Sequence, residues 1–108
     1  MPYSDIGEAV DYIRSNHRQR ITVDQLAQKS GLSARQLNRK FNEAFGMSAQ
    51  AFFTKTRIQA ASDALLNSAK SITDIAHEFG FCDQSAFTQA FSKHTGSTPL
   101  KFRKRYQN

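Results

Sequence analysis

An internal repeat places two similar segments 49 to 50 residues apart in this chain of 108 residues. At an offset of 49, the matching pairs are Thr22-Val23 with Ser71-Ile72, Leu26-Ala27 with Ile75-Ala76, and Gly31-Leu32 with Gly80-Phe81. At an offset of 50, they are Ser33 with Asp83, Leu37 with Phe87, Phe41 with Phe91, Gly46 with Gly96, Ser48 with Thr98, and Phe52 with Phe102. One residue is therefore added in the second copy. Because such repeats mark duplicated structural units, we expect two similar halves.

Apolar residues recur every three or four positions, and no long stretch alternates strictly, which predicts helices throughout. Capping residues stand at most of the predicted helix starts, and Thr22 with Gln25 has the spacing of a capping box. Seven helices are predicted, the first by the stripe Ile6, Val10 and Ile13 and the others by the starts Thr22, Ser33, Ser48, Ser71, Asp83 and Thr98. We predict an all-α fold in which helix-turn-helix subdomains at residues 1–47 and 69–108 flank a linker helix at 48–68.

Each repeat unit has the layout of a helix-turn-helix, a short helix followed by a glycine turn and a second helix. The formal net charge of +6 fits a partner with dense negative charge, although charge alone does not separate a nucleic acid from another anionic surface. Arg35, Asn38 and Arg39 share one face of the predicted third helix. Arg can bond guanine and Asn can bond adenine through two hydrogen bonds, so we predict that these residues contact base edges. A merely solvated polar face is the alternative.

The sixth helix carries uncharged polar residues at the corresponding positions. The predicted base contacts there are Gln84, Ser85, Thr88 and Gln89. The candidate contacts to the DNA backbone are Ser33, Lys55, Arg57, Asp83 and Lys93. For the cations the alternatives are solvated surface and, for Arg57, a role inside the protein. The basic tail either contacts the DNA backbone or polymerase, or interacts with its own helix dipole, and consists of Lys101, Arg103, Lys104 and Arg105.

The predicted linker helix offers a geometric check on this interpretation. About 19 helical residues span roughly 28 Å, which is close to the 34 Å of one DNA turn. Two recognition helices could then enter successive major grooves. Because the two copies are in tandem in one polypeptide, we expect an asymmetric site that a monomer can bind.

A longer set of residues resembles the signature of the AraC/XylS family of bacterial transcription regulators. The matching positions are Arg57-Ile58, Ala61, Leu65, Ile72, Ile75-Ala76, Gly80-Phe81, Phe87, Phe91, Gly96 and Thr98-Pro99. The resemblance continues upstream from Ile21 to Phe52 and implies seven helices, of which the third and sixth enter the major groove. It assigns base contacts to the same residues as the physical argument, and it implies RNA polymerase as a further partner. The chain departs from better-known members at Gln89, where they have arginine, and at Arg35, where stand-alone members have tryptophan.

The resemblance leaves open whether the chain is a stand-alone regulator or part of a longer protein that dimerises through an N-terminal domain. A protein-interaction domain with an acidic partner is the alternative function. We predict no enzymatic activity, cofactor or metal site, because no catalytic constellation is present and His17, His77 and His94 are too scattered to share an ion. A redox role is the less favoured interpretation of Cys82. Without a membrane span or export signal, we expect a cytoplasmic, nucleoid-associated protein.

Overall fold

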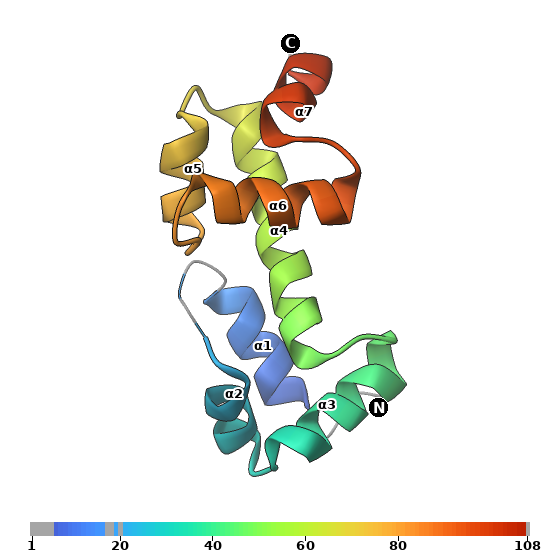
Figure 1. Ribbon diagram of the computed structural model, residues 1–108. Coiled ribbons are helices and arrows are strands. Elements are labelled where there is room, and N and C mark those ends of the chain that lie inside the picture. Colours follow the sequence, from blue (N-terminus) through green and yellow to red (C-terminus); the bar gives the residue numbers. More distant parts are fainter. Residues whose placement is uncertain (1–5, 17–18, 20, 108) are drawn as a thin grey trace. The chain divides into compact units, whose positions relative to one another are not determined.

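The structure, a computed structural model, describes residues 6–16, 19 and 21–107, and this part of the chain forms seven helices and no strand (Figure 1). The helices are α1 (Gly7–Ser15), α2 (Val23–Ser30), α3 (Ala34–Phe45), α4 (Ala49–Asn67), α5 (Ile72–Glu78), α6 (Gln84–Thr95) and α7 (Pro99–Tyr106). The predicted all-α fold is therefore confirmed, together with the position of each helix.

Side-chain caps fix where most of the helices begin. The cap side chain accepts a hydrogen bond from the backbone N–H three residues later at Thr22, Ser33, Ser48, Ser71, Asp83 and Thr98. The predicted capping box at the start of α2 is present, since Thr22 N–H also donates to the side chain of Gln25. Ser33 and Gln36 form a second box, which the sequence analysis did not identify. These bonds pair N–H groups that have no partner within the helix.

The turns of the two helix-turn-helix units have the same backbone conformation at their first two positions and differ after them. Gly31 and Gly80 have φ angles of 68° and 82°, a left-handed conformation that glycine adopts without steric cost. In both turns the next residue closes the same backbone bond, from Leu32 N–H to Ala27 and from Phe81 N–H to Ala76. The additional residue of the second copy follows this shared part. Cys82 occupies it and is exposed.

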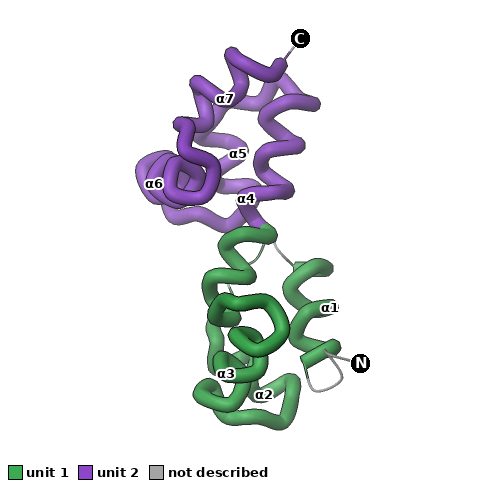
Figure 2. Tube along the Cα trace, turned by 90° about the vertical axis from the view of Figure 1, so that its right-hand side faces the viewer, with its two compact units in different colours: residues 1–56 green, residues 57–108 purple. Residues whose placement is uncertain are grey.

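The chain divides into two compact units, residues 1–56 and 57–108, and the division falls within α4 (Figure 2). Each unit has its own core of buried apolar side chains. In unit 1 the core consists of Ile6, Ala9, Val10, Ile13, Ile21, Leu26, Ala27, Leu37, Phe41, Ala49 and Phe53. In unit 2 it consists of Ile58, Ala61, Leu65, Ile75, Ala76, Phe79, Phe87 and Phe91. The helix predicted as a linker therefore supplies core residues to both units.

The structural repeat is longer than the repeat seen in the sequence. Ile58, Ala61 and Leu65 of α4 have the same spacing as Ile6, Ala9 and Ile13 around α1, and both sets are buried. The second half of α4 thus opens unit 2 as α1 opens unit 1. At the other end, the ring of Phe52 lies 5.3 Å from that of Phe41, and Phe102 lies 5.2 Å from Phe91. Each unit is accordingly a helix-turn-helix between an opening and a closing helical segment.

Candidate DNA interface

The second helix of the helix-turn-helix in unit 1, α3, has one buried face and one exposed face. Leu37 and Phe41 are fully buried, and the high polarity of the remaining positions leaves the other side in solvent. Arg35 and Arg39 are exposed on that side, as the sequence analysis expected. Burial of the apolar stripe therefore fixes the direction in which these two cations project.

Arg39 carries an ion pair on the helix surface. Its Nε lies 4.0 Å from Oε1 of Glu43 one turn later, and the two side chains are 65% and 69% exposed. An exposed pair of this kind contributes only about 0.3–0.5 kcal/mol. The guanidinium of Arg39 can therefore leave Glu43 for another acceptor at little cost.

Asn38 differs from its two neighbours on this face because it is partly buried and bonded within the protein. Its side-chain oxygen accepts a hydrogen bond of 3.0 Å from the backbone N–H of Ala49, the first residue of α4. The backbone oxygen of Asn38 in turn accepts a bond from the side chain of Asn42. Asn38 thus joins α3 to the start of α4 inside unit 1, a contact that the sequence spacing did not indicate.

The second helix of the helix-turn-helix in unit 2, α6, packs into the core through Phe87 and Phe91, which are fully buried. On its other side Ser85 and Gln89 are exposed, and Thr88 is partly buried. Gln84 is also exposed, and its side-chain oxygen lies 2.6 Å from the hydroxyl of Thr73, a residue of α5. The four residues predicted to contact bases thus lie near the start of α6 without bringing any charge.

Ser33 and Asp83, two of the candidate backbone contacts, serve as helix caps. The Ser33 hydroxyl accepts from Gln36 N–H at 3.1 Å, and a carboxylate oxygen of Asp83 accepts from Ala86 N–H at 2.8 Å. An ionised Asp83 would also repel a phosphate. The contribution that these residues make in this structure is to start α3 and α6.

The three predicted cationic backbone contacts differ in accessibility. Lys55 on α4 and Lys93 on α6 are exposed. Arg57 is buried at 9% exposure, and its guanidinium carbon lies 5.5 Å from the centre of the Phe81 ring. Of the two interpretations of Arg57, the geometry favours the role inside the protein.

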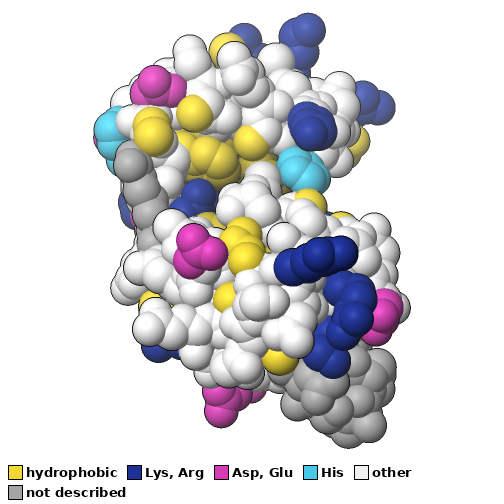
Figure 3. All heavy atoms as spheres, turned by 60° about the horizontal axis from the view of Figure 1, so that its bottom comes forward, with side chains coloured by type: hydrophobic (Ala, Val, Ile, Leu, Met, Phe, Trp, Pro, Cys, Tyr) yellow, Lys and Arg dark blue, Asp and Glu magenta, His cyan; other side chains and the backbone are white. Residues whose placement is uncertain are grey.

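Figure 3 shows that Lys and Arg side chains gather side by side over part of the face it presents, with an acidic side chain next to them.

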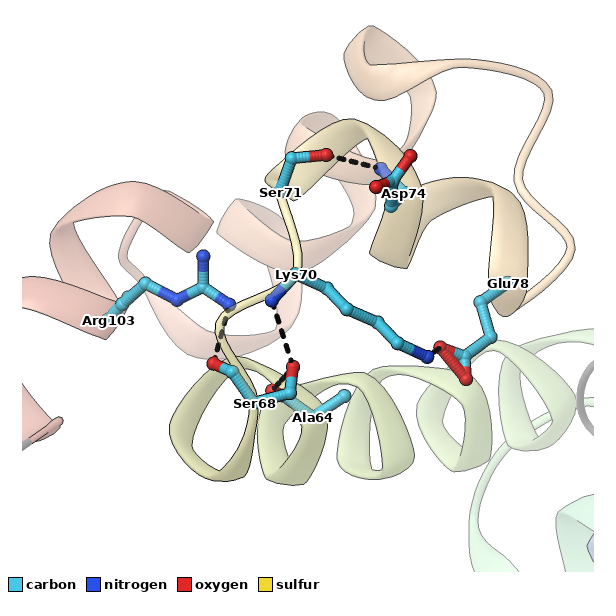
Figure 4. Close-up of polar contacts among 7 residues, drawn as sticks. All are labelled: Ala64, Ser68, Lys70, Ser71, Asp74, Glu78 and Arg103. Carbon is cyan, nitrogen blue, oxygen red and sulfur yellow. Dashed lines mark hydrogen bonds and ion pairs between the residues drawn. The ribbon is translucent and has the colours of Figure 1, made fainter.

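The basic tail is likewise divided between solvent and the protein. Arg103 donates from Nε to the backbone oxygen of Leu65 at 2.9 Å and from its terminal nitrogen to that of Ser68, as Figure 4 shows for the second bond. Gln107 also donates to Leu65 and Ser68. These bonds pair carbonyl groups at the end of α4. Lys101, Lys104 and Arg105 remain exposed.

Other kinds of site find little support in the described part of the chain. It contains no group of three His, Cys, Asp or Glu side chains that could hold a metal ion. His17, which the sequence analysis considered, lies outside the described residues. Within the described residues, no helix combines the length and the apolar character needed to cross a membrane.

Comparison with known proteins identifies the fold and the family. A family model described as a helix-turn-helix domain matches residues 26–105. The DNA-binding domain of AdpA, solved in complex with a target DNA, superposes with a TM-score of 0.89 over 94% of this chain and 92% of that domain at 24% identity. A transcriptional regulator from Chromobacterium violaceum, described as containing an AraC-type DNA-binding domain, superposes with a TM-score of 0.87 over 94% of this chain and 91% of that chain at 27% identity. The chain belongs to the AraC-type helix-turn-helix family. It carries the DNA-binding domain of bacterial transcription regulators.

Relatives of this AraC-type domain differ widely in length. The probable transcription factor PqrA of Proteus vulgaris is 40% identical over 83 residues, which are 77% of this chain and 68% of PqrA. The lactose operon transcription activator of Staphylococcus xylosus is 30% identical over 99 residues, which are 92% of this chain and 36% of the activator. The chain therefore spans about two thirds of one relative and about a third of the other.

Proposed function

We propose that this chain regulates transcription by binding a specific double-stranded DNA sequence, with α3 and α6 inserted into successive major grooves. The base contacts come from Arg35, Asn38 and Arg39 on α3 and from Gln84, Ser85, Thr88 and Gln89 on α6. Exposed Lys55 and Lys93 contact phosphates, and Arg57, Ser33 and Asp83 support the structure instead. RNA polymerase as a second partner rests on the family resemblance alone.

The observation that carries this proposal is the pair of exposed polar faces on two equivalent helices. Each face lies opposite the buried Leu37 and Phe41 or Phe87 and Phe91, so each helix can enter a groove without disturbing its core. Arg35 and Arg39 are side chains suited to guanine, whereas the α6 face is uncharged. Because the two faces differ, the bound site should be asymmetric. Because both helices belong to one polypeptide, one copy of the chain should suffice to bind it. The shared fold with a domain solved on its target DNA supports the same mode of binding.

Selection of bound duplexes from a random DNA pool tests the proposal directly. At about 150 mM salt, where nonspecific phosphate binding is already weakened, we expect enrichment of one asymmetric site with two conserved blocks. A single block would mean that only one helix contacts bases. If no sequence is enriched, the chain by itself does not act as a sequence-specific binder, and the two remaining interpretations are an interaction domain for an acidic protein partner and a fragment that binds DNA only as part of a longer protein.

Lys55 and Arg57 offer a matched pair of cations two residues apart on α4. Lys55→Ala removes an exposed charge. The slope of log Kd against log salt should therefore fall by about 1, the contribution of one phosphate contact, while thermal stability is retained. Arg57→Ala removes a buried side chain stacked over Phe81, so stability should fall by about 1–2 kcal/mol while the slope stays unchanged. Thermal unfolding and salt titrations of both variants check these expectations. The reverse pattern would assign the phosphate contact to Arg57.

A further inference from the structure

Asn38 is the one residue among the predicted base contacts whose amide orientation is fixed by a backbone group. The Ala49 N–H can only donate, so the group that lies 3.0 Å from it must be the Asn38 oxygen. The other polar group of the side chain is Nδ2, which carries two hydrogens and can only donate. If Asn38 contacts DNA as proposed above, it does so with this nitrogen.

The bond to Ala49 is costly to break. Ala49 is fully buried, so its N–H would lose its partner without gaining water if the amide turned over. Ser48 already serves a different group, because its hydroxyl accepts from Ala51 N–H. An unpaired buried donor lowers the population of the turned amide on the order of tenfold to a hundredfold. This penalty is comparable with the gain from one good pair of base contacts.

We propose that Asn38 determines specificity as a hydrogen-bond donor alone, and therefore selects guanine rather than adenine at its base pair. The paired contact with adenine needs the amide oxygen to accept from N6 while Nδ2 donates to N7, and the oxygen is directed at α4. Guanine presents two acceptors, N7 and O6, to the two hydrogens of Nδ2. This proposal rests on the proposed function and changes the expectation that Asn38 binds adenine.

Asn38→Asp separates the two groups of the amide. The aspartate keeps an oxygen for Ala49 N–H, so the fold should be retained and the melting temperature should not fall. It loses both hydrogens of Nδ2, and with them the donor that would contact the base. In the duplex selection, guanine should lose about tenfold in preference at one base pair, and cytosine should gain there, because a carboxylate accepts from cytosine N4. Asn42→Asp makes the same charge change one turn later on α3. We expect it to weaken binding to all sequences alike.

A measurement on the DNA tests the same contact while the protein itself is unchanged. With the unchanged protein, 7-deazaguanine at the position identified by Asn38→Asp lacks the N7 acceptor and should weaken binding about five- to tenfold. The same substitution at a guanine outside the two blocks should have no effect.

The outcomes separate this proposal from the function on which it rests. If the unchanged protein enriches no sequence, the proposed function fails. If it enriches a site but selects adenine at the base pair that responds to Asn38→Asp, the amide oxygen is used and the donor-only role is overturned. If no base pair responds to Asn38→Asp beyond the effect of Asn42→Asp, Asn38 only caps α4, and the proposal is equally overturned.

Discussion

Replacing Phe41 with alanine should unfold unit 1 under conditions in which the original chain is stable. Phe41 is fully buried, and its ring lies 5.6 Å from that of Phe45 and 5.3 Å from that of Phe52. Truncating a buried Phe to Ala costs about 3–5 kcal/mol. Whole domains are stable by only about 5–15 kcal/mol, and a unit of this size stands at the lower end. Thermal unfolding followed by circular dichroism measures the effect. The helical signal should be lost at a lower temperature in Phe41→Ala than in the original chain.

Amide hydrogen exchange then shows where the Phe41→Ala chain has opened. The two cores have no buried residue in common, so we expect protection to be lost in α2 and α3 and retained in α5 and α6. Phe91→Ala is the matched variant, since Phe91 contacts Phe102 as Phe41 contacts Phe52, and it should give the opposite pattern. Simultaneous loss of protection throughout either variant would show instead that the two units unfold as one.

Most of the fold could be predicted because its signals are local. Thr22 and Gln25 lie three residues apart, and Gly31 ends a helix by its own backbone preference, so a short window of sequence contains both. The division of α4 could not be predicted in this way. Its residues are helical without interruption, and only the tertiary structure reveals that Phe53 packs into one core and Ile58 into the other. The matching spacing of Ile58, Ala61 and Leu65 with the residues around α1 was the available signal.

The exposed faces of α3 and α6 follow from apolar periodicity, but the partners of individual polar residues do not. The bond from Ala49 to Asn38 joins residues 11 apart, and Arg103 bonds Leu65 at a separation of 38. Arg57 is buried, and its guanidinium lies over the ring of Phe81 in the turn before α6. These contacts depend on how helices pack within a unit. Sequence spacing therefore identified which side chains share a face, but not which of them the protein itself engages.

Replacing Arg39 with alanine should abolish the preference for one base pair and leave the others intact. Its guanidinium is exposed and only weakly held by Glu43, so it is available to donate two bonds to guanine. Loss of such a contact costs about 1–3 kcal/mol, or roughly tenfold to a hundredfold in affinity for the selected site. Binding curves with the selected duplex and with the three duplexes that carry the other base pairs at this position measure the change. In the variant, the four affinities should converge.

Arg39→Lys is the control that separates charge from geometry. Lysine keeps the positive charge but lacks the rigid fork of donors, so it should restore general affinity more than preference at the base pair. Glu43→Gln removes the competing carboxylate, and because an exposed pair is weak we expect at most a few-fold tighter binding. If Arg39→Ala instead weakened binding to every duplex equally, and lysine restored it fully, Arg39 would contact a phosphate. The assignment of base contacts on α3 would then rest on Arg35 and Asn38.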